Sequence, residues 1–94
     1  MLSVRVRYLG RFREITGKRE EVVLFDGGTL MDLLDFLVSV YGERFFVAVF
    51  DKKDGGSLRE DIIILVDQKP VGGNVFVSLG DNSVVSILPF VSGG

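Results

Sequence analysis

Apolar and polar side chains alternate in the first stretch of the chain. In SVRVRYL, the apolar residues Val4, Val6 and Tyr8 are separated by serine and arginine, which is the period of a half-buried β-strand. REEVVLF, residues 19–25, predicts a second strand. The intervening GRFREITG, residues 10–17, is short and bounded by glycine, so we expect a turn or a single helical turn joining an antiparallel hairpin.

The period then changes to that of a helix. In TLMDLLDFLVSVYG, apolar residues recur three and four positions apart, as in an amphipathic helix with one buried face. Thr29 is a good N-cap and Asp32 lies in the first turn, where its charge favours the helix dipole. The helix is therefore expected to begin near Leu30 and to end at Gly42.

The second half of the chain is expected to be mainly β-structure. RFFVAVF, residues 44–50, fits either a short helix or a strand, because a brief apolar run does not distinguish them. IIILVDQ, residues 62–68, is β-branched and predicts a central strand. KPVGGNVFVS, residues 69–78, allows only a short edge strand. A last strand is expected through Ile87 and Leu88, preceded by Asn82 in a left-handed turn.

This element order predicts an α+β, β-grasp (ubiquitin-like) fold. We expect a four- or five-stranded mixed sheet, with one main helix across one face and the first and last strands adjacent in the middle. A single domain spans residues 1–94, with a flexible tail at 90–94. The residues expected to be buried are Val4, Val6, Tyr8, Val22, Leu24, Leu33, Leu34, Leu37, Ile64, Val66 and Ile87.

Composition limits the chemistry. The chain of 94 residues contains no cysteine and no histidine, so it lacks a thiolate nucleophile and the usual neutral-pH base, and we expect neither a metal site nor autonomous catalysis. A net charge of -2 has the wrong sign for nucleic-acid binding. The apolar runs are shorter than the roughly 20 residues of a membrane span, so no membrane association and a cytoplasmic location are expected.

Four motifs carry a family resemblance: RYLGRFREITG, GGTLMDLLDFL, ILVDQKPV and the ending ILPFVSGG. With them the chain resembles the ubiquitin-like sulfur-carrier family (MoaD/ThiS-like), which includes the molybdopterin synthase small subunit, the thiamine sulfur carrier and the small archaeal modifiers. YLGRFRE and LPFVSGG are most similar to the molybdopterin synthase subunit.

The resemblance implies a function in sulfur transfer. An E1-like enzyme would use ATP to adenylate the carboxylate of Gly94, and a sulfur donor protein would convert it to a thiocarboxylate. That sulfur would serve molybdopterin synthesis with the synthase large subunit. The chain itself would bind no cofactor and act as a non-catalytic small subunit. The resemblance assigns partner binding to Gly93, Ser92, Val91, Phe90, Pro89 and Arg13.

Several alternatives stay open on the sequence. Phe90 either anchors a partner or folds back on the core, whereas Arg5 and Arg7 are expected on a solvated strand face. Pro89 fixes φ and cannot donate a sheet hydrogen bond, so the last strand should end there. The alternative function is a ubiquitin-like protein modifier conjugated through Gly94 to target lysines. An interaction domain with a frayed tail is the third interpretation.

Overall fold

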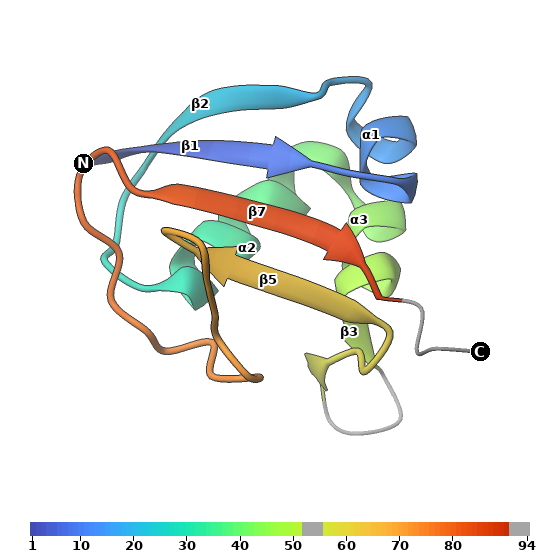
Figure 1. The fold of residues 1–94 in the computed structure, drawn as a ribbon. Helices are drawn as coiled ribbons and strands as arrows, with labels where there is room; N and C mark the ends of the chain where they lie inside the picture. The colour runs from blue at the N-terminus through green and yellow to red at the C-terminus, as the bar shows by residue number, and fades with distance from the viewer. Residues whose placement is uncertain (52–55, 91–94) are drawn as a thin grey trace.

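A mixed β-sheet forms one layer of the protein, and helices cover one of its faces (Figure 1). The computed structural model describes residues 1–51 and 56–90. In chain order the elements are β1 (Leu2–Tyr8), α1 (Arg11–Thr16), β2 (Glu20–Phe25), α2 (Leu30–Tyr41), α3 (Glu43–Val49), β3 (Phe50–Asp51), β4 (Ser57–Leu58), β5 (Ile62–Val66), β6 (Lys69–Pro70) and β7 (Val84–Pro89).

The strand order confirms the predicted fold. Within the described residues the main sheet has five strands in the order β2-β1-β7-β5-β6. β1 and β7 pair in parallel at its centre, with Tyr8 opposite Ile87, while β1 with β2, β5 with β7 and β5 with β6 are antiparallel. The first and last strands are thus adjacent, as a β-grasp requires.

Helix α2 begins and ends where the sequence predicts. Thr29 caps it in a reciprocal capping box: the Thr29 Oγ1 accepts the backbone N–H of Asp32 at 3.2 Å, and the Asp32 carboxylate accepts the backbone N–H of Thr29 at 3.1 Å. Hydrogen bonds from the Gly28 and Thr29 backbone hold the pKa of Asp32 below its usual value. At the other end, the Gly42 N–H donates to the Val38 carbonyl at 2.8 Å.

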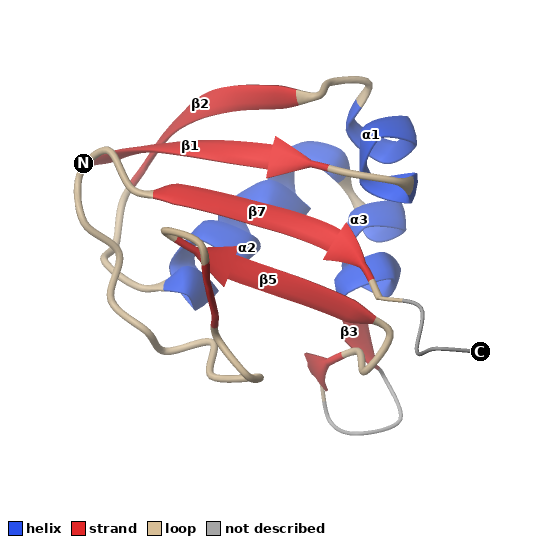
Figure 2. Cartoon of the chain, viewed as in Figure 1, coloured by secondary structure: helices blue, strands red, loops and turns tan. Residues whose placement is uncertain are grey.

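The ambiguous stretches form short helices. Residues 11–16 of the predicted turn form α1, and α3 is helical because Phe45, Ala48 and Val49, at helical spacing, are all buried. Figure 2 shows α2 and α3 behind the sheet and α1 at the end where β1 finishes. β3 and β4 pair antiparallel on either side of residues 52–55, which lie outside the described residues. Among the described helices, none has the length and hydropathy needed to cross a membrane.

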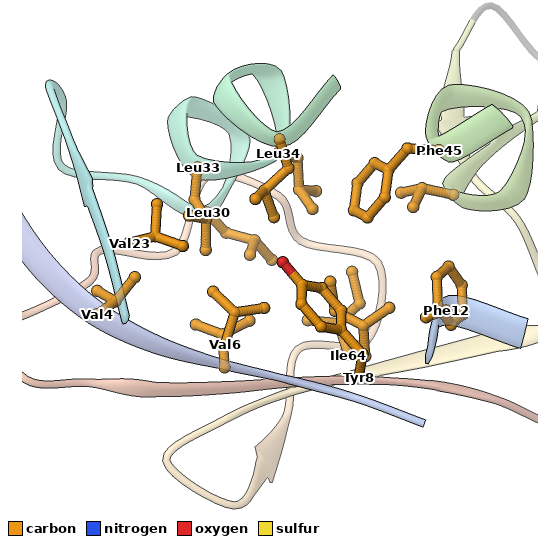
Figure 3. Packing of buried hydrophobic residues seen from close by; sticks show 14 of the residues in the cluster. Val4, Val6, Tyr8, Phe12, Val23, Leu30, Leu33, Leu34, Phe45 and Ile64 are labelled. Atoms are coloured by element: carbon orange, nitrogen blue, oxygen red, sulfur yellow. The ribbon is translucent and has the colours of Figure 1, made fainter. Parts of the chain in front are cut away.

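The core lies between the sheet and α2 (Figure 3). Eight of the eleven residues expected there are buried, namely Val4, Val6, Tyr8, Leu33, Leu34, Leu37, Ile64 and Ile87. Val66 is half-buried and packs against the cluster. Asn82 has φ 69°, which confirms its predicted left-handed conformation.

The expected burial of Val22 and Leu24 is wrong. Each is 59% exposed, whereas Val23 and Phe25 are buried. Directly opposed residues of an antiparallel pair point to the same face, and the register places Val23 opposite the buried Val4. Because VVLF is apolar in both phases of the alternation, the pattern alone left the inward phase of β2 undetermined.

That phase also turns Glu21 toward the helices. Its carboxylate accepts the Tyr8 hydroxyl at 2.6 Å and the Tyr41 hydroxyl at 2.5 Å, both on Oε2, while Lys18 Nζ lies 3.2 Å from Oε1. β1, β2 and the end of α2 are therefore joined by one polar cluster at the rim of the core. Burial and the Glu21 carboxylate together raise the pKa of Tyr8, so its hydroxyl remains a donor.

Burial alone would raise the pKa of Glu21, but hydrogen bonds from Tyr41, Tyr8 and Lys18 outweigh it and hold the pKa below its usual value. A carboxyl whose pKa is lower in the folded than in the unfolded state stabilises the fold above the unfolded pKa. This stabilisation is lost as the pH falls through the folded pKa.

Glu21→Gln is expected to lower the free energy of unfolding at pH 7 by about 1–3 kcal/mol, because charge-assisted hydrogen bonds to a partly buried carboxylate are lost. The deficit should shrink between about pH 5 and pH 3, because only the parent loses the carboxylate on protonation. Urea unfolding at a series of pH values measures both.

The matched control is Glu20→Gln. Glu20 is adjacent in sequence and pairs with Arg5 at 3.0 Å, but both side chains are about half exposed, so its loss should change stability by less than about 1 kcal/mol. An equal effect of the two substitutions, or a pH-independent deficit for Glu21→Gln, would contradict the assignment.

Candidate functional site

The candidate site is the place where the chain leaves the sheet after β7. Leu9 N–H donates to the Ile87 carbonyl at 3.1 Å on one side of β7. On the other side, Phe90 N–H donates to the Asp61 carbonyl at 2.8 Å. The strand ends at Pro89 as expected, but the backbone stays fixed through Phe90. We call this region, formed by Gly10, Asp61, Pro89 and Phe90, the tail root.

Gly10 lets the chain before α1 lie directly on Pro89. Its φ is +57°, and a Cβ built there would lie 2.6 Å from Pro89 Cγ and 2.9 Å from Cδ. Such distances are shorter than van der Waals contact, and the positive φ disfavours other residues. Gly10, the first residue of GRFREITG, therefore has a packing function: only glycine lets α1 and the end of β7 approach this closely.

Asp61 is held by two arginines. Arg59 makes a two-point interaction, with Nε 2.9 Å from Oδ1 and Nη2 3.0 Å from Oδ2. Arg11 Nη2 lies 3.4 Å from Oδ1. The Arg59 hydrogen bonds lead the interactions that hold the pKa of Asp61 below its usual value, so the carboxylate remains ionised. The same residue offers its carbonyl to Phe90, so α1, the turn before β5 and the tail root are connected.

Phe90 does not belong to the buried core. Its side chain is 46% exposed, which removes full burial against the core as an explanation for an aromatic residue at this position. Exposed aromatic side chains are frequent anchors in protein interfaces. The remaining expected tail residues, Val91, Ser92, Gly93 and Gly94, lie outside the described residues.

The predicted arginine lies beside the tail root rather than in it. Arg13 is exposed, and its Nε donates to the Tyr8 carbonyl at 3.1 Å, at the end of β1. Its partner role stays a prediction. Arg5 and Arg7 are exposed on β1, which confirms the expected solvated strand face.

Sequence reasoning missed the groups that fix the tail root. The sequence places Gly10 in a turn and in the motif RYLGRFREITG without indicating its contact with Pro89, and neither Asp61 nor Arg59 is part of a motif. Arg59 and Asp61 belong to the short sequence RED and form an ion pair. This pair affects the tail root only because the Asp61 carbonyl also accepts the Phe90 N–H. Among residues 1–51 and 56–90, no group of three or more histidine, cysteine or carboxylate residues is arranged to hold a metal ion.

Comparison with known proteins identifies the family. The ThiS family model matches residues 6–94, nearly the whole chain. The chain belongs to the ThiS family. It is therefore a member of a group of ubiquitin-like sulfur carriers and modifiers. No curated protein sequence matches it significantly.

Three solved structures show what this ThiS-family protein is similar to. Small archaeal modifier protein 1 of Methanosarcina acetivorans is 30% identical, with 100% of this chain and 98% of that chain covered and a TM-score of 0.80. A Pyrococcus furiosus protein named molybdopterin converting factor subunit 1 is 26% identical, with 97% and 100% covered and a TM-score of 0.69. A chain of the Amycolatopsis orientalis BexX/CysO complex is 25% identical, with 97% and 99% covered and a TM-score of 0.74.

Gly10→Ala is expected to destabilise the ThiS-family protein by about 1–3 kcal/mol, because a strained φ and a clash with the Pro89 ring add together. Thermal or urea unfolding measures the loss. The amide resonance of Phe90 should shift as well, because the displaced Pro89 moves its neighbour.

Gly17→Ala serves as the control. Gly17 also has a positive φ, +74°, but a Cβ there would meet nothing within 4 Å. It reports the cost of a positive φ in the αL region without a clash, whereas Gly10, with ψ -132°, lies outside that region and adds strain of its own. Combining Gly10→Ala with Pro89→Ala should restore part of the lost stability, since the ring is removed. Equal losses for Gly10→Ala and Gly17→Ala would show that the Pro89 contact has no energetic role.

Proposed function

We propose that this protein is a sulfur carrier whose C-terminal Gly94 is adenylated by a partner enzyme and converted to a thiocarboxylate. The proposal takes Gly94 as the terminal residue. Its main support is the family match, which runs through Gly93 and Gly94. The fixed tail root agrees with it, because β7 brings the chain to the edge of the body at Pro89, five residues before Gly94.

The chemistry of the chain fits a carrier that is acted upon. A carboxylate oxygen is a poor leaving group, so the carboxyl carbon must be activated by ATP before sulfur can replace the oxygen. Gly93 and Gly94 lack a Cβ, which lets their backbone enter a narrow active site on another protein. With no cysteine or histidine in the sequence, the sulfur is carried on the terminal carboxyl group and the catalytic side chains belong to the partners.

The proposed acceptor is the precursor of molybdopterin, in a complex with a synthase large subunit. The similarity to the Pyrococcus furiosus molybdopterin converting factor subunit 1 supports this choice. A sulfur donor protein and an E1-like adenylating enzyme complete the set of partners. The similarity to a chain of the BexX/CysO complex supports a function exercised in a complex with a partner protein.

Protein modification is the second candidate function. The chain is 30% identical over its whole length to small archaeal modifier protein 1 of Methanosarcina acetivorans. A modifier would be activated at Gly94 in the same way, and its acyl group would then pass to a lysine of a target protein. The two functions therefore differ in the acceptor and share the activation step.

Intact-mass spectrometry tests the activation. With an E1-like enzyme, ATP and a sulfur donor, the protein should gain about 16 Da, the difference between sulfur and oxygen, on a chain without cysteine. Deleting Gly94 should abolish the gain. Adding one alanine after Gly94 should do the same, because the carboxylate moves by about 3.5 Å.

Thermal unfolding of the deletion variant is the control, and its Tm should match that of the parent. Undiminished activation without Gly94 would refute the proposal. A species with the summed mass of this chain and a target protein, linked through Gly94 and a lysine, would assign the modifier function instead.

A further inference from the structure

A hollow of about 410 Å³ is lined by residues of α1 and α3 and by Arg59. Helices α1 and α3 lie at the end of the molecule where β7 finishes (Figure 1). Three arginines line the hollow: Arg11 from α1, Arg44 from α3 and Arg59 from the segment after β4. Ile15, Val47 and Ala48 provide apolar lining. We call this hollow the arginine groove.

The guanidinium groups of the groove are incompletely paired. Arg59 occupies both oxygens of Asp61. Arg11 reaches Asp61 at only 3.4 Å, and its Nη2 is buried without a hydrogen-bond partner. Within the described part of the chain, Arg44 forms no ion pair.

The charge of the groove opposes that of the chain as a whole. Its lining holds three arginines and one carboxylate, Glu14, while Asp61 and Asp51 lie near Arg59 outside the lining, in a protein of net charge -2. Arg44, which forms no ion pair in the described part of the chain, thus has capacity for additional acceptors, because a guanidinium offers five N–H donors. Carboxylates are suited to this arrangement, since they accept paired hydrogen bonds from arginine.

The lining narrows the choice of ligand. Val47 is 40% exposed, so a free phosphate or other small anion would leave the apolar part of the groove in water. A nucleic acid would meet no aromatic side chain among the lining residues and would be repelled by Glu14. An acidic peptide segment that also carries an apolar side chain satisfies both the arginines and the apolar surface.

The position of the groove indicates which protein supplies that segment. Arg11 and Arg59 both contact Asp61, whose carbonyl fixes Phe90. The four residues beyond Phe90 span at most about 14 Å when extended. Under the proposed function, in which Gly94 is the terminal residue, a protein that holds Gly94 in its active site must therefore lie against this end of the body.

We propose that the arginine groove binds an acidic, partly apolar segment of the enzyme that activates the tail. The identity of this partner rests on the proposed function. The groove lies on the body of the carrier, separate from the reacting carboxyl group of Gly94. It therefore contributes to binding of the partner and not to the chemical step. Losing it should raise the KM for the carrier and leave kcat unchanged.

Arg44→Glu tests the proposal in the ATP-dependent activation assay. Arg44 is exposed and makes no ion pair in the described chain, so the fold should survive, as checked by Tm. We expect KM to rise at least about tenfold, an estimate for replacing one attractive charge contact by a repulsive one. Arg44→Lys should retain most of the affinity, because it keeps the positive charge.

Arg7→Glu is the matched control. It makes the same charge change at an exposed arginine of β1, outside the groove, and should leave KM within about twofold, as a charge remote from the interface would. A KM for Arg44→Glu within twofold of the parent value overturns the proposal. An equal rise for Arg7→Glu, or a fall in kcat alone, overturns it as well.

A peptide titration separates this inference from the proposed function. A synthetic heptapeptide of six glutamates around a central leucine, added to the ¹⁵N-labelled protein without enzyme or ATP, should shift amides of α1, α3 and Arg59, and a lysine version should not. Absence of shifts at millimolar peptide overturns the groove as an acidic-peptide site. Absence of any activation of the parent chain instead refutes the proposed function, whatever the peptide does.

Discussion

The parallel pairing of β1 with β7 is the constraint on which the rest of the structure depends. Parallel neighbours need a long crossover connection, and here that connection contains α2, which covers the inner face of the sheet. Because parallel strands end at the same edge, the chain after β1 and the chain after β7 emerge side by side. Leu9 and Gly10 therefore meet Ile87 and Pro89, and α1 starts at the point where the tail begins.

These contacts between the segment before α1 and the end of β7 fix the position at which the chain leaves the sheet. Gly10 allows the close approach to Pro89, and the Asp61 carbonyl holds the next backbone N–H. The first contact acts on the Pro89 ring and the second on the Phe90 backbone, so together they fix the end of β7 and the residue that follows it. A carrier needs such an exit if its terminus is to reach the active site of another protein in one geometry. The residues that confer it lie far from the terminus in sequence.

The elements that could be predicted from sequence were those with local signals. Thr29 and Gly42 delimited α2 because capping is a short-range interaction, and the single-phase alternation of Val4, Val6 and Tyr8 fixed the inner face of β1. β2 failed because its apolar residues occupy both phases, so cross-strand register decided which side is buried. The Glu21 cluster and the contacts of Asp61 with Arg11 and Phe90 join segments that are distant in sequence, so no local pattern encodes them.

The tail itself offers little with which partners can distinguish one carrier from another. Gly93 and Gly94 provide no side chain, so under the proposed function an activating enzyme would find little in these two residues to recognise. Discrimination therefore has to come from the body near the tail root, where charged and apolar side chains are held in place. The contacts of Asp61 give this a physical basis, because they connect Arg11 and Arg59 to the backbone of Phe90, and a partner docked beside α1 and α3 as proposed would bind next to the tail root. If the tail root were mobile, binding of a partner to the body would not determine where the terminal carboxylate lies. The binding energy gained on the body would then no longer position the carboxylate.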